Sequence, residues 1–118
     1  MAYTHDGKKP VVLKNDPIDE DSSDWVYFVY DDWLTTGETI TAHSATVTGG
    51  TKETEPTSVG PITLDGTEYQ TAYAVEVKSS VGSTQISVTH RVTTTKTGAV
   101  DLGRTNIDHS AIIQVKVL

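Results

Sequence analysis

The stretch TQISVTHRVTT, residues 84–94, decides the fold class because its side chains alternate between two kinds. Successive side chains of a β-strand project to opposite faces of the sheet, so a period of two indicates a strand with one buried face. The face that we expect to be buried carries Ile86, Val88, His90 and Val92. The opposite face carries Gln85, Ser87, Thr89, Arg91 and Thr93. The stretch therefore predicts a strand with one face buried in a hydrophobic core.

The same alternation recurs on both sides of this strand. At the end of the chain, the inward face is predicted to carry Ala111, Ile113, Val115 and Val117. Upstream, one face carries Tyr69, Thr71, Tyr73, Val75 and Val77. Residues 79–83 then turn the chain into the 84–94 strand, as a hairpin or as a crossover between sheets. Before them, Asp65-Gly66 predicts a tight hairpin turn, because this dipeptide tolerates positive φ at both central positions.

Three other segments have less regular patterns. Val11–Lys14 is predicted to be a short first strand. The apolar phase changes between Ile40 and Val47, and since a one-residue slip moves every side chain to the other face, we expect a bulge or strand break near His43. Residues 51–60 are polar without a period, which is typical of a long exposed loop.

The composition supports an all-β fold. The 14 Val, 7 Ile and 20 Thr make 41 β-branched residues among 118, against 5 Leu and 1 Met. Such side chains favour a pleated sheet over a helix. Seven or eight short strands with turns about every ten residues predict an antiparallel, immunoglobulin-like β-sandwich over residues 10–118. Residues 1–9 have too little apolar surface to fold alone, so we expect a flexible arm that orders on a neighbouring subunit.

An aromatic segment, residues 25–33, departs from the alternation. It holds five of the eight aromatic residues of the chain, and both of its faces are apolar. One face is expected to pack on the core, and the other face can be covered by a partner subunit. The alternatives are that the N-terminal segment folds over this face, or that Trp33 closes the bottom of the core. The candidate partner-binding residues are Trp25, Tyr27, Phe28, Tyr30 and Trp33, together with Lys8 and Lys9, which would pair with acidic groups.

Charge and hydropathy narrow the kind of partner. The net charge is −7, so the chain has no electrostatic attraction to nucleic acid or anionic membrane. No apolar run approaches the roughly 18 residues that span a bilayer. The first ten residues lack an apolar segment and a cleavage site, so we expect synthesis in the cytoplasm.

The sequence offers little for catalysis, and we expect a protein that is not an enzyme and that binds no metal or cofactor. The motifs of serine hydrolases, zinc proteases and phosphate-binding loops are missing from it, and it contains no cysteine. A metal would need the fold to gather the four distant histidines. The acidic segment 16–24 offers oxygen ligands for calcium but lacks the usual ligand spacing, so a solvated loop is favoured.

Several short motifs in a fixed order resemble one family. They are KNDP at 14–17, DW at 24–25, DWL at 32–34, GETI at 37–40, VTHRVTT at 88–94 and GRT at 103–105. This pattern is similar to that of small immunoglobulin-like β-sandwich virion structural proteins of tailed bacteriophages. The resemblance covers most of the chain from about Lys14 onward.

The resemblance implies a structural part of a virion, made in many copies. We expect a capsid-associated cement or decoration protein that binds the major capsid protein or other virion subunits through the aromatic segment and the arm. Two alternatives stay open. One is a module of the tail, neck or fibre. The other is a module that binds glycans or the host surface, in which aromatic rings stack on sugars and the 16–24 loop holds calcium.

Overall fold

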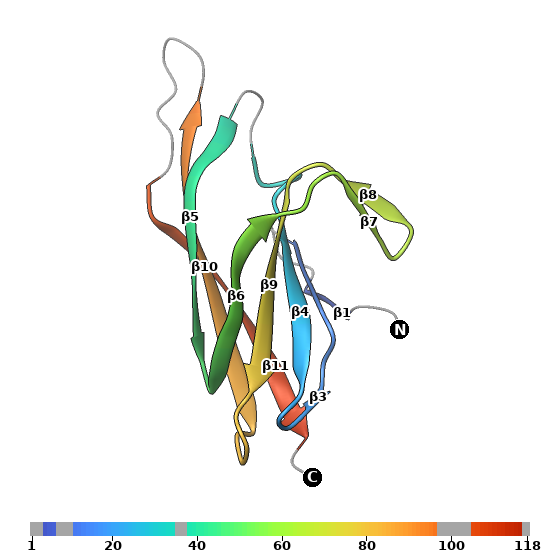
Figure 1. Cartoon of the computed structure of the whole chain (residues 1–118). Coiled ribbons are helices and arrows are strands. Elements are labelled where there is room, and N and C mark those ends of the chain that lie inside the picture. Colours follow the sequence, from blue (N-terminus) through green and yellow to red (C-terminus); the bar gives the residue numbers. More distant parts are fainter. Residues whose placement is uncertain (1–3, 7–10, 35–37, 97–104, 117–118) are drawn as a thin grey trace.

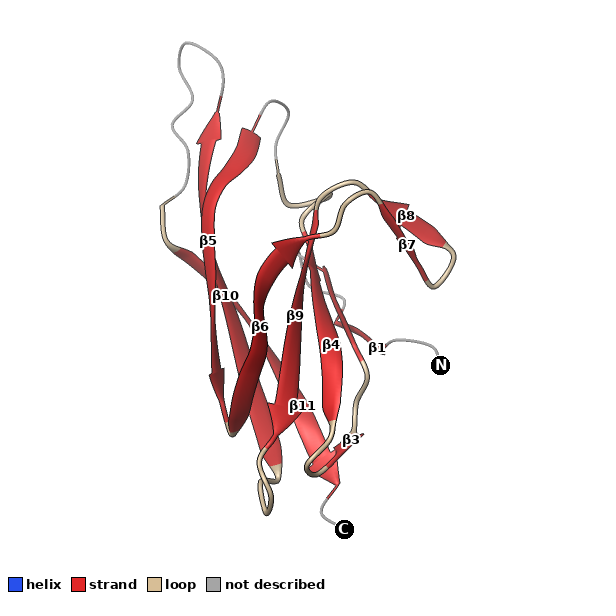
Figure 2. Ribbon diagram, in the orientation of Figure 1, coloured by secondary structure: helices blue, strands red, loops and turns tan. Residues whose placement is uncertain are grey.

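The computed structural model describes residues 4–6, 11–34, 38–96 and 105–116. Within these ranges the chain is all β, with eleven strands and no helix (Figures 1 and 2). In chain order the strands are β1 (Thr4–Asp6), β2 (Val11–Lys14), β3 (Ile18–Asp19), β4 (Ser23–Val29), β5 (Glu38–Thr48), β6 (Gly50–Ser58), β7 (Ile62–Leu64), β8 (Thr67–Tyr69), β9 (Ala72–Ser79), β10 (Gln85–Lys96) and β11 (Ile107–Lys116).

The strands form two main sheets and a hairpin. The five-stranded sheet has the order β1-β2-β4-β9-β6, and the four-stranded sheet has the order β3-β11-β10-β5. The two sheets pack on each other, and the β7–β8 hairpin lies beyond one end of β4 and β9 (Figure 1).

One strand pair departs from the predicted antiparallel arrangement. Ile18 of β3 lies beside Val115 of β11, and these two strands run parallel. The reason is that the chain leaves the five-stranded sheet after Lys14 and joins the other sheet at Ile18. Every other pairing between the described strands is antiparallel.

The main core lies between the two sheets, and the predicted inward faces of the last two long strands are confirmed. Ile86, Val88, His90 and Val92 of β10 are completely buried. Ala111, Ile113 and Val115 of β11 are buried with them, whereas Val117 lies outside the described residues. The five-stranded sheet contributes Val12, Val26, Phe28, Tyr73, Val75 and Val77. Burial of each such apolar side chain stabilises the fold by roughly 1.5–3 kcal/mol.

The turn predicted at Asp65-Gly66 is confirmed. Both residues have positive φ, 50° and 80°, and they join β7 to β8 with Leu64 opposite Thr67. The predicted strand that carries Tyr69, Thr71, Tyr73, Val75 and Val77 is divided, since β8 ends at Tyr69 and β9 begins at Ala72. Residues 80–84 then carry the chain from β9 in one main sheet to β10 in the other, so the link is a crossover between sheets.

The irregularity predicted near His43 is a bulge at Thr41. Thr93 of β10 lies opposite Ala42, but Thr94 lies opposite Ile40, so Thr41 is the extra residue. A bulge of this kind restores the apolar phase without ending the strand. For this reason β5 runs unbroken over eleven residues.

The prediction of a long loop over residues 51–60 is wrong, because Gly50–Ser58 form β6. This strand pairs with β9 at the edge of the five-stranded sheet, with two register shifts. An edge strand needs neither a continuous apolar face nor a full ladder, and it tolerates Pro56. The polar composition that suggests a loop is therefore also compatible with this strand.

Part of the predicted N-terminal arm is paired. Thr4–Asp6 form β1, which lies antiparallel to β2 with His5 opposite Leu13. This differs from the expectation that residues 1–9 order only on a neighbouring subunit. Lys8 and Lys9 lie outside the described residues.

Candidate partner-binding surface and ring cluster

Strand β4 carries three of the predicted partner-binding residues, Trp25, Tyr27 and Phe28, and it divides them between two environments. Val26 and Phe28 face the four-stranded sheet, and Tyr30 follows them into the same core. The side chains of Phe28 and Tyr30 are 0% exposed. The expectation that these two residues contact a partner does not fit their position, because a partner reaches only the surface.

The other face of β4 is apolar, as predicted, and the chain itself covers part of it. Val29 packs with Leu13, Ala72 and Leu64 in a second, smaller core, and Leu64 comes from the β7–β8 hairpin. Tyr27 packs against the rim of this second core and is partly exposed. Part of the cover for this face therefore comes from a hairpin in the middle of the sequence, and not from the N-terminal segment or Trp33 as expected.

Trp25 and Tyr27 are the predicted anchors of β4 that reach the surface of the described chain. Both lie on the face of β4 that is turned away from the main core, and both are partly exposed. Opposite Trp25 on β9 is Glu76, which accepts a hydrogen bond from Thr54 at 3.0 Å. An aromatic surface with a polar border is typical of a protein interface.

Trp33 closes one end of the main core, which agrees with the second alternative. Its backbone N–H donates to the carbonyl of Tyr30 at 3.0 Å, in a tight turn after β4. Its indole ring contacts the ring of Tyr30 at 5.4 Å and the ring of His109 at 4.9 Å, both edge-on.

These contacts belong to a ring cluster that sequence reasoning missed. Its members come from both sheets and from the turn after β4, and they are Phe28, Tyr30, Trp33, His43, Tyr73, His90 and His109. At its centre is His90, whose Nδ1 lies 2.6 Å from the hydroxyl oxygen of Tyr30. On the other side of the imidazole, Nε2 lies 3.2 Å from Nδ1 of His43. A hydrogen-bonded chain thus leads from Tyr30 in the core to His43 at the surface.

Loss of contact with water disfavours the charged forms of the groups in this hydrogen-bonded chain. It lowers the pKa of His90 to about 3, with smaller contributions from the charges of His43 and His109. It also lowers the pKa of His43. The pKa of Tyr30 is raised, mainly by burial and to a smaller extent by the charge of Tyr73. Burial also raises the pKa of Tyr73. One neutral tautomer of His90 satisfies both of its hydrogen bonds, since one ring nitrogen accepts and the other donates.

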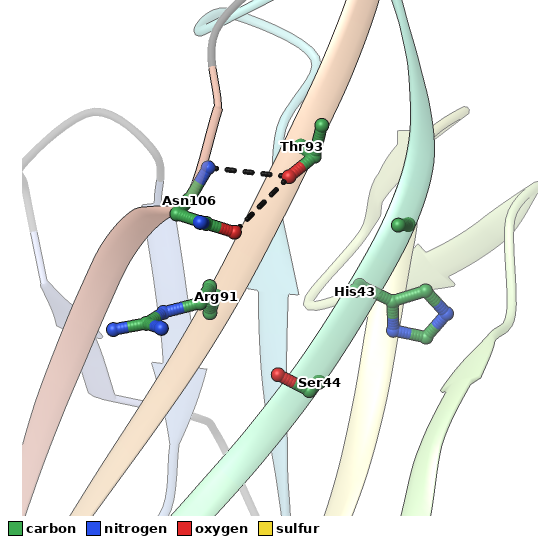
Figure 3. Close-up of a pocket in the computed structure, with 6 residues that line it drawn as sticks. His43, Ser44, Arg91, Thr93 and Asn106 are labelled. Carbon is green, nitrogen blue, oxygen red and sulfur yellow. Dashed lines mark hydrogen bonds between the residues drawn. The ribbon is translucent and has the colours of Figure 1, made fainter.

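The outer face of the four-stranded sheet is polar and carries a shallow hollow of about 120 Å³ (Figure 3). Arg91 holds Asp108 with two hydrogen bonds, at 2.7 and 3.1 Å. The hydroxyl of Thr93 accepts from the N–H of Asn106 at 3.2 Å. The imidazole of His43 points away from Arg91 in Figure 3, so the hollow and the ring cluster lie on opposite sides of β5.

The acidic segment 16–24 uses its carboxylates to bind other parts of the chain. Asp16 accepts from the N–H of Gln114 at 3.0 Å, and Glu20 accepts from that of Gly82 at 2.7 Å. Asp21 lies 3.3 Å from the ammonium of Lys78. Among the described residues, no three or more His, Asp or Glu side chains are arranged to hold a metal ion.

The fold does gather three of the four histidines, and the sequence contains a partial signal for this. His90 stands at an inward position of a regular alternation, which predicts its burial. His43 and His109 join it because β5 and β11 are the two neighbours of β10. On β5 the residue opposite His90 is Ala45, so the strand register alone does not predict that His43 contacts His90.

Comparison of this chain with protein-family models, with curated proteins and with solved structures finds no match. The part of the chain that the structure describes contains no helix long and apolar enough to cross a membrane.

Proposed function

We propose that this protein is a structural subunit of a tailed-phage virion, attached to the capsid as a cement or decoration protein. The observation that carries the proposal is the position of Trp25 and Tyr27, two aromatic side chains that remain partly exposed on the outer face of β4. The phage-like motifs from Lys14 to Thr105 support the same assignment. In this proposal the protein acts by binding and catalyses no reaction, and its place of action is the virion.

The strand order supports an immunoglobulin-like fold as part of this proposal. In that fold the first, second, fifth and fourth of seven strands form one sheet, and the third, sixth and seventh form the other. If β2 is the first strand, β2-β4-β9-β6 match the first sheet and β5-β10-β11 match the second. The β7–β8 hairpin is then an insertion between the fourth and fifth strands.

The partner is expected to be a protein, namely the major capsid protein or another virion subunit. The net charge of −7 disfavours nucleic acid and anionic lipid as partners. A standard interface buries about 800 Å² on each side, and a few aromatic anchors supply most of its free energy. Many copies on one shell strengthen a weak single contact through avidity.

Quantitative mass spectrometry of purified virions whose genome encodes this chain tests the proposal. We expect peptides of this chain at hundreds of copies per particle. Six or twelve copies would move the protein to the tail, neck or fibre, and absence from the particles would refute a virion role. Sugar binding by the isolated protein in calorimetric titration would instead favour a glycan-binding module.

A double variant, Trp25→Ala with Tyr27→Ala, tests the surface itself. We expect it to lower the copy number per particle while the protein stays folded. Val81→Ala is the matched control, because Val81 is the most exposed large apolar side chain of the described residues at 74%. Equal copy numbers for the double variant and the wild type would show that the partner binds elsewhere.

A further inference from the structure

The ring cluster joins the two main sheets at a point where apolar packing is replaced by hydrogen-bonded rings. Tyr30 and Tyr73 belong to the side of the five-stranded sheet, whereas His43, His90 and His109 come from the four-stranded sheet. The ring of Tyr73 contacts those of His43 and His90 in the other sheet and that of Tyr30, with centroid distances from 4.3 to 6.0 Å. Much of the contact between the sheets in this region is therefore made by titratable groups.

We propose that the ring cluster is an acid-sensitive lock between the two sheets, which holds while His90 and His43 are neutral and loosens when they take up protons. The proposal rests on geometry: a fully buried imidazole, hydrogen-bonded at both nitrogens and surrounded by other rings. It is independent of the virion assignment, since it concerns the cohesion of the two sheets in the isolated chain.

Among the described residues, no charged group faces His90 that would neutralise a positive charge on its ring. The titratable groups that face it are Tyr30, Tyr73, His43 and His109, which are neutral or cationic below pH 7. The carboxylates on the strands packed against it are engaged elsewhere: Asp24 with Asn15, Glu38 with Thr94, Glu76 with Thr54 and Asp108 with Arg91. A proton on His90 is thus an unpaired charge in a low-dielectric site.

Protonation of His43 in addition to His90 breaks the hydrogen bond between the two rings. The two imidazoles share one hydrogen bond between Nε2 of His90 and Nδ1 of His43. If both rings are protonated, both of these nitrogens carry hydrogen and the bond is lost. Since His43 is exposed to solvent, it can take up this proton without prior unfolding. The surface end of the chain therefore provides the entry point for acid.

The experiment measures the unfolding equilibrium in urea between pH 7 and about 5.5, where ordinary carboxylates stay ionised. A Trp25→Phe background leaves Trp33, a member of the ring cluster, as the fluorescent reporter. We expect the folding equilibrium constant to fall about tenfold per pH unit below 6.5 for each histidine kept neutral only in the folded state. In the His90→Phe variant, the fall of the folding equilibrium constant should be smaller by about a factor of ten per pH unit.

Two further measurements keep the test decisive if His90→Phe does not fold. His43→Gln changes an exposed residue and should give a shallower slope than the parent, whereas Ser87→Ala, on the outer face of β10, should leave the slope unchanged. In the parent protein, the ring signals of His90 in NMR spectra should not titrate between pH 7 and 4.5. Equal slopes in the parent and in both histidine variants, or a His90 ring that titrates near pH 6.5 in the folded protein, would overturn the proposal.

Discussion

The hydroxyl oxygen of Tyr30 lies 2.6 Å from Nδ1 of His90, although 60 positions of sequence separate the two residues. Tyr30 directly follows β4, and His90 is in the middle of β10 in the opposite sheet. Both side chains are 0% exposed, so water cannot replace either partner. This contact fixes the spacing of the two sheets at one point of the core and makes the core depend on a polar pair.

Tyr30→Phe is expected to destabilise the protein by about 1–3 kcal/mol, because it leaves a buried nitrogen of His90 without its partner. The free energy of unfolding in urea at pH 7.5 measures the loss. Tyr69→Phe, at a partly exposed ring of β8, is the matched control and should change this energy by less than about 0.5 kcal/mol. A Tyr30→Phe protein as stable as the wild type would show that the hydrogen bond contributes nothing.

Alkaline pH should unfold the protein through Tyr30 and Tyr73. Their pKa values are raised in the folded state, so the unfolded state loses these protons first, near pH 10, and stability falls as pH rises above that value. Absorbance of tyrosinate near 295 nm should therefore rise in two stages, with the second stage coinciding with loss of the β-sheet circular dichroism signal. Tyr30→Phe should reduce the second stage. A single stage near pH 10 with the fold intact would contradict the prediction.

Leu64→Ala should destabilise the protein by about 2–5 kcal/mol and uncover the outer face of β4, since Leu64 is 6% exposed in the second core. Urea unfolding gives the energy, and binding of a hydrophobic dye reports the uncovered surface. Ile62→Ala, on the same hairpin but only partly buried, should have a smaller effect on both. If dye binding does not rise, the hairpin is not the cover of Val29.

Asp31→Ala should cost about 1–3 kcal/mol because the carboxylate of Asp31 accepts hydrogen bonds from the backbone N–H groups of Gln70 and Thr71, each at 2.8 Å. These bonds tie the end of β4 to the turn between β8 and β9. Asp31→Asn, which keeps one acceptor oxygen, should lose less. Faster hydrogen exchange at the amides of Gln70 and Thr71 in the alanine variant would locate the effect, and unchanged exchange would contradict it.

The features that the sequence predicts well are local. The period of two assigns the buried faces of β10 and β11, the dipeptide Asp65-Gly66 specifies its turn, and the change of phase before Ala45 indicates the bulge at Thr41. Each depends on neighbouring residues only, and the geometry of a pleated strand translates it directly into structure. The apolar character of both faces of β4 is likewise evident in residues 25–30.

Other features were decided by contacts between segments far apart in the chain. Composition alone does not distinguish β6 from a loop, because an edge strand has no apolar period of its own. Two apolar faces on β4 require cover but do not specify its source, and only the tertiary structure places Leu64 over Val29 and sends Phe28 and Tyr30 inward. The ring cluster arises in the same way: the sequence supplies the histidines and tyrosines, and the packing of one sheet on the other brings Tyr30 to His90 and His90 to His43.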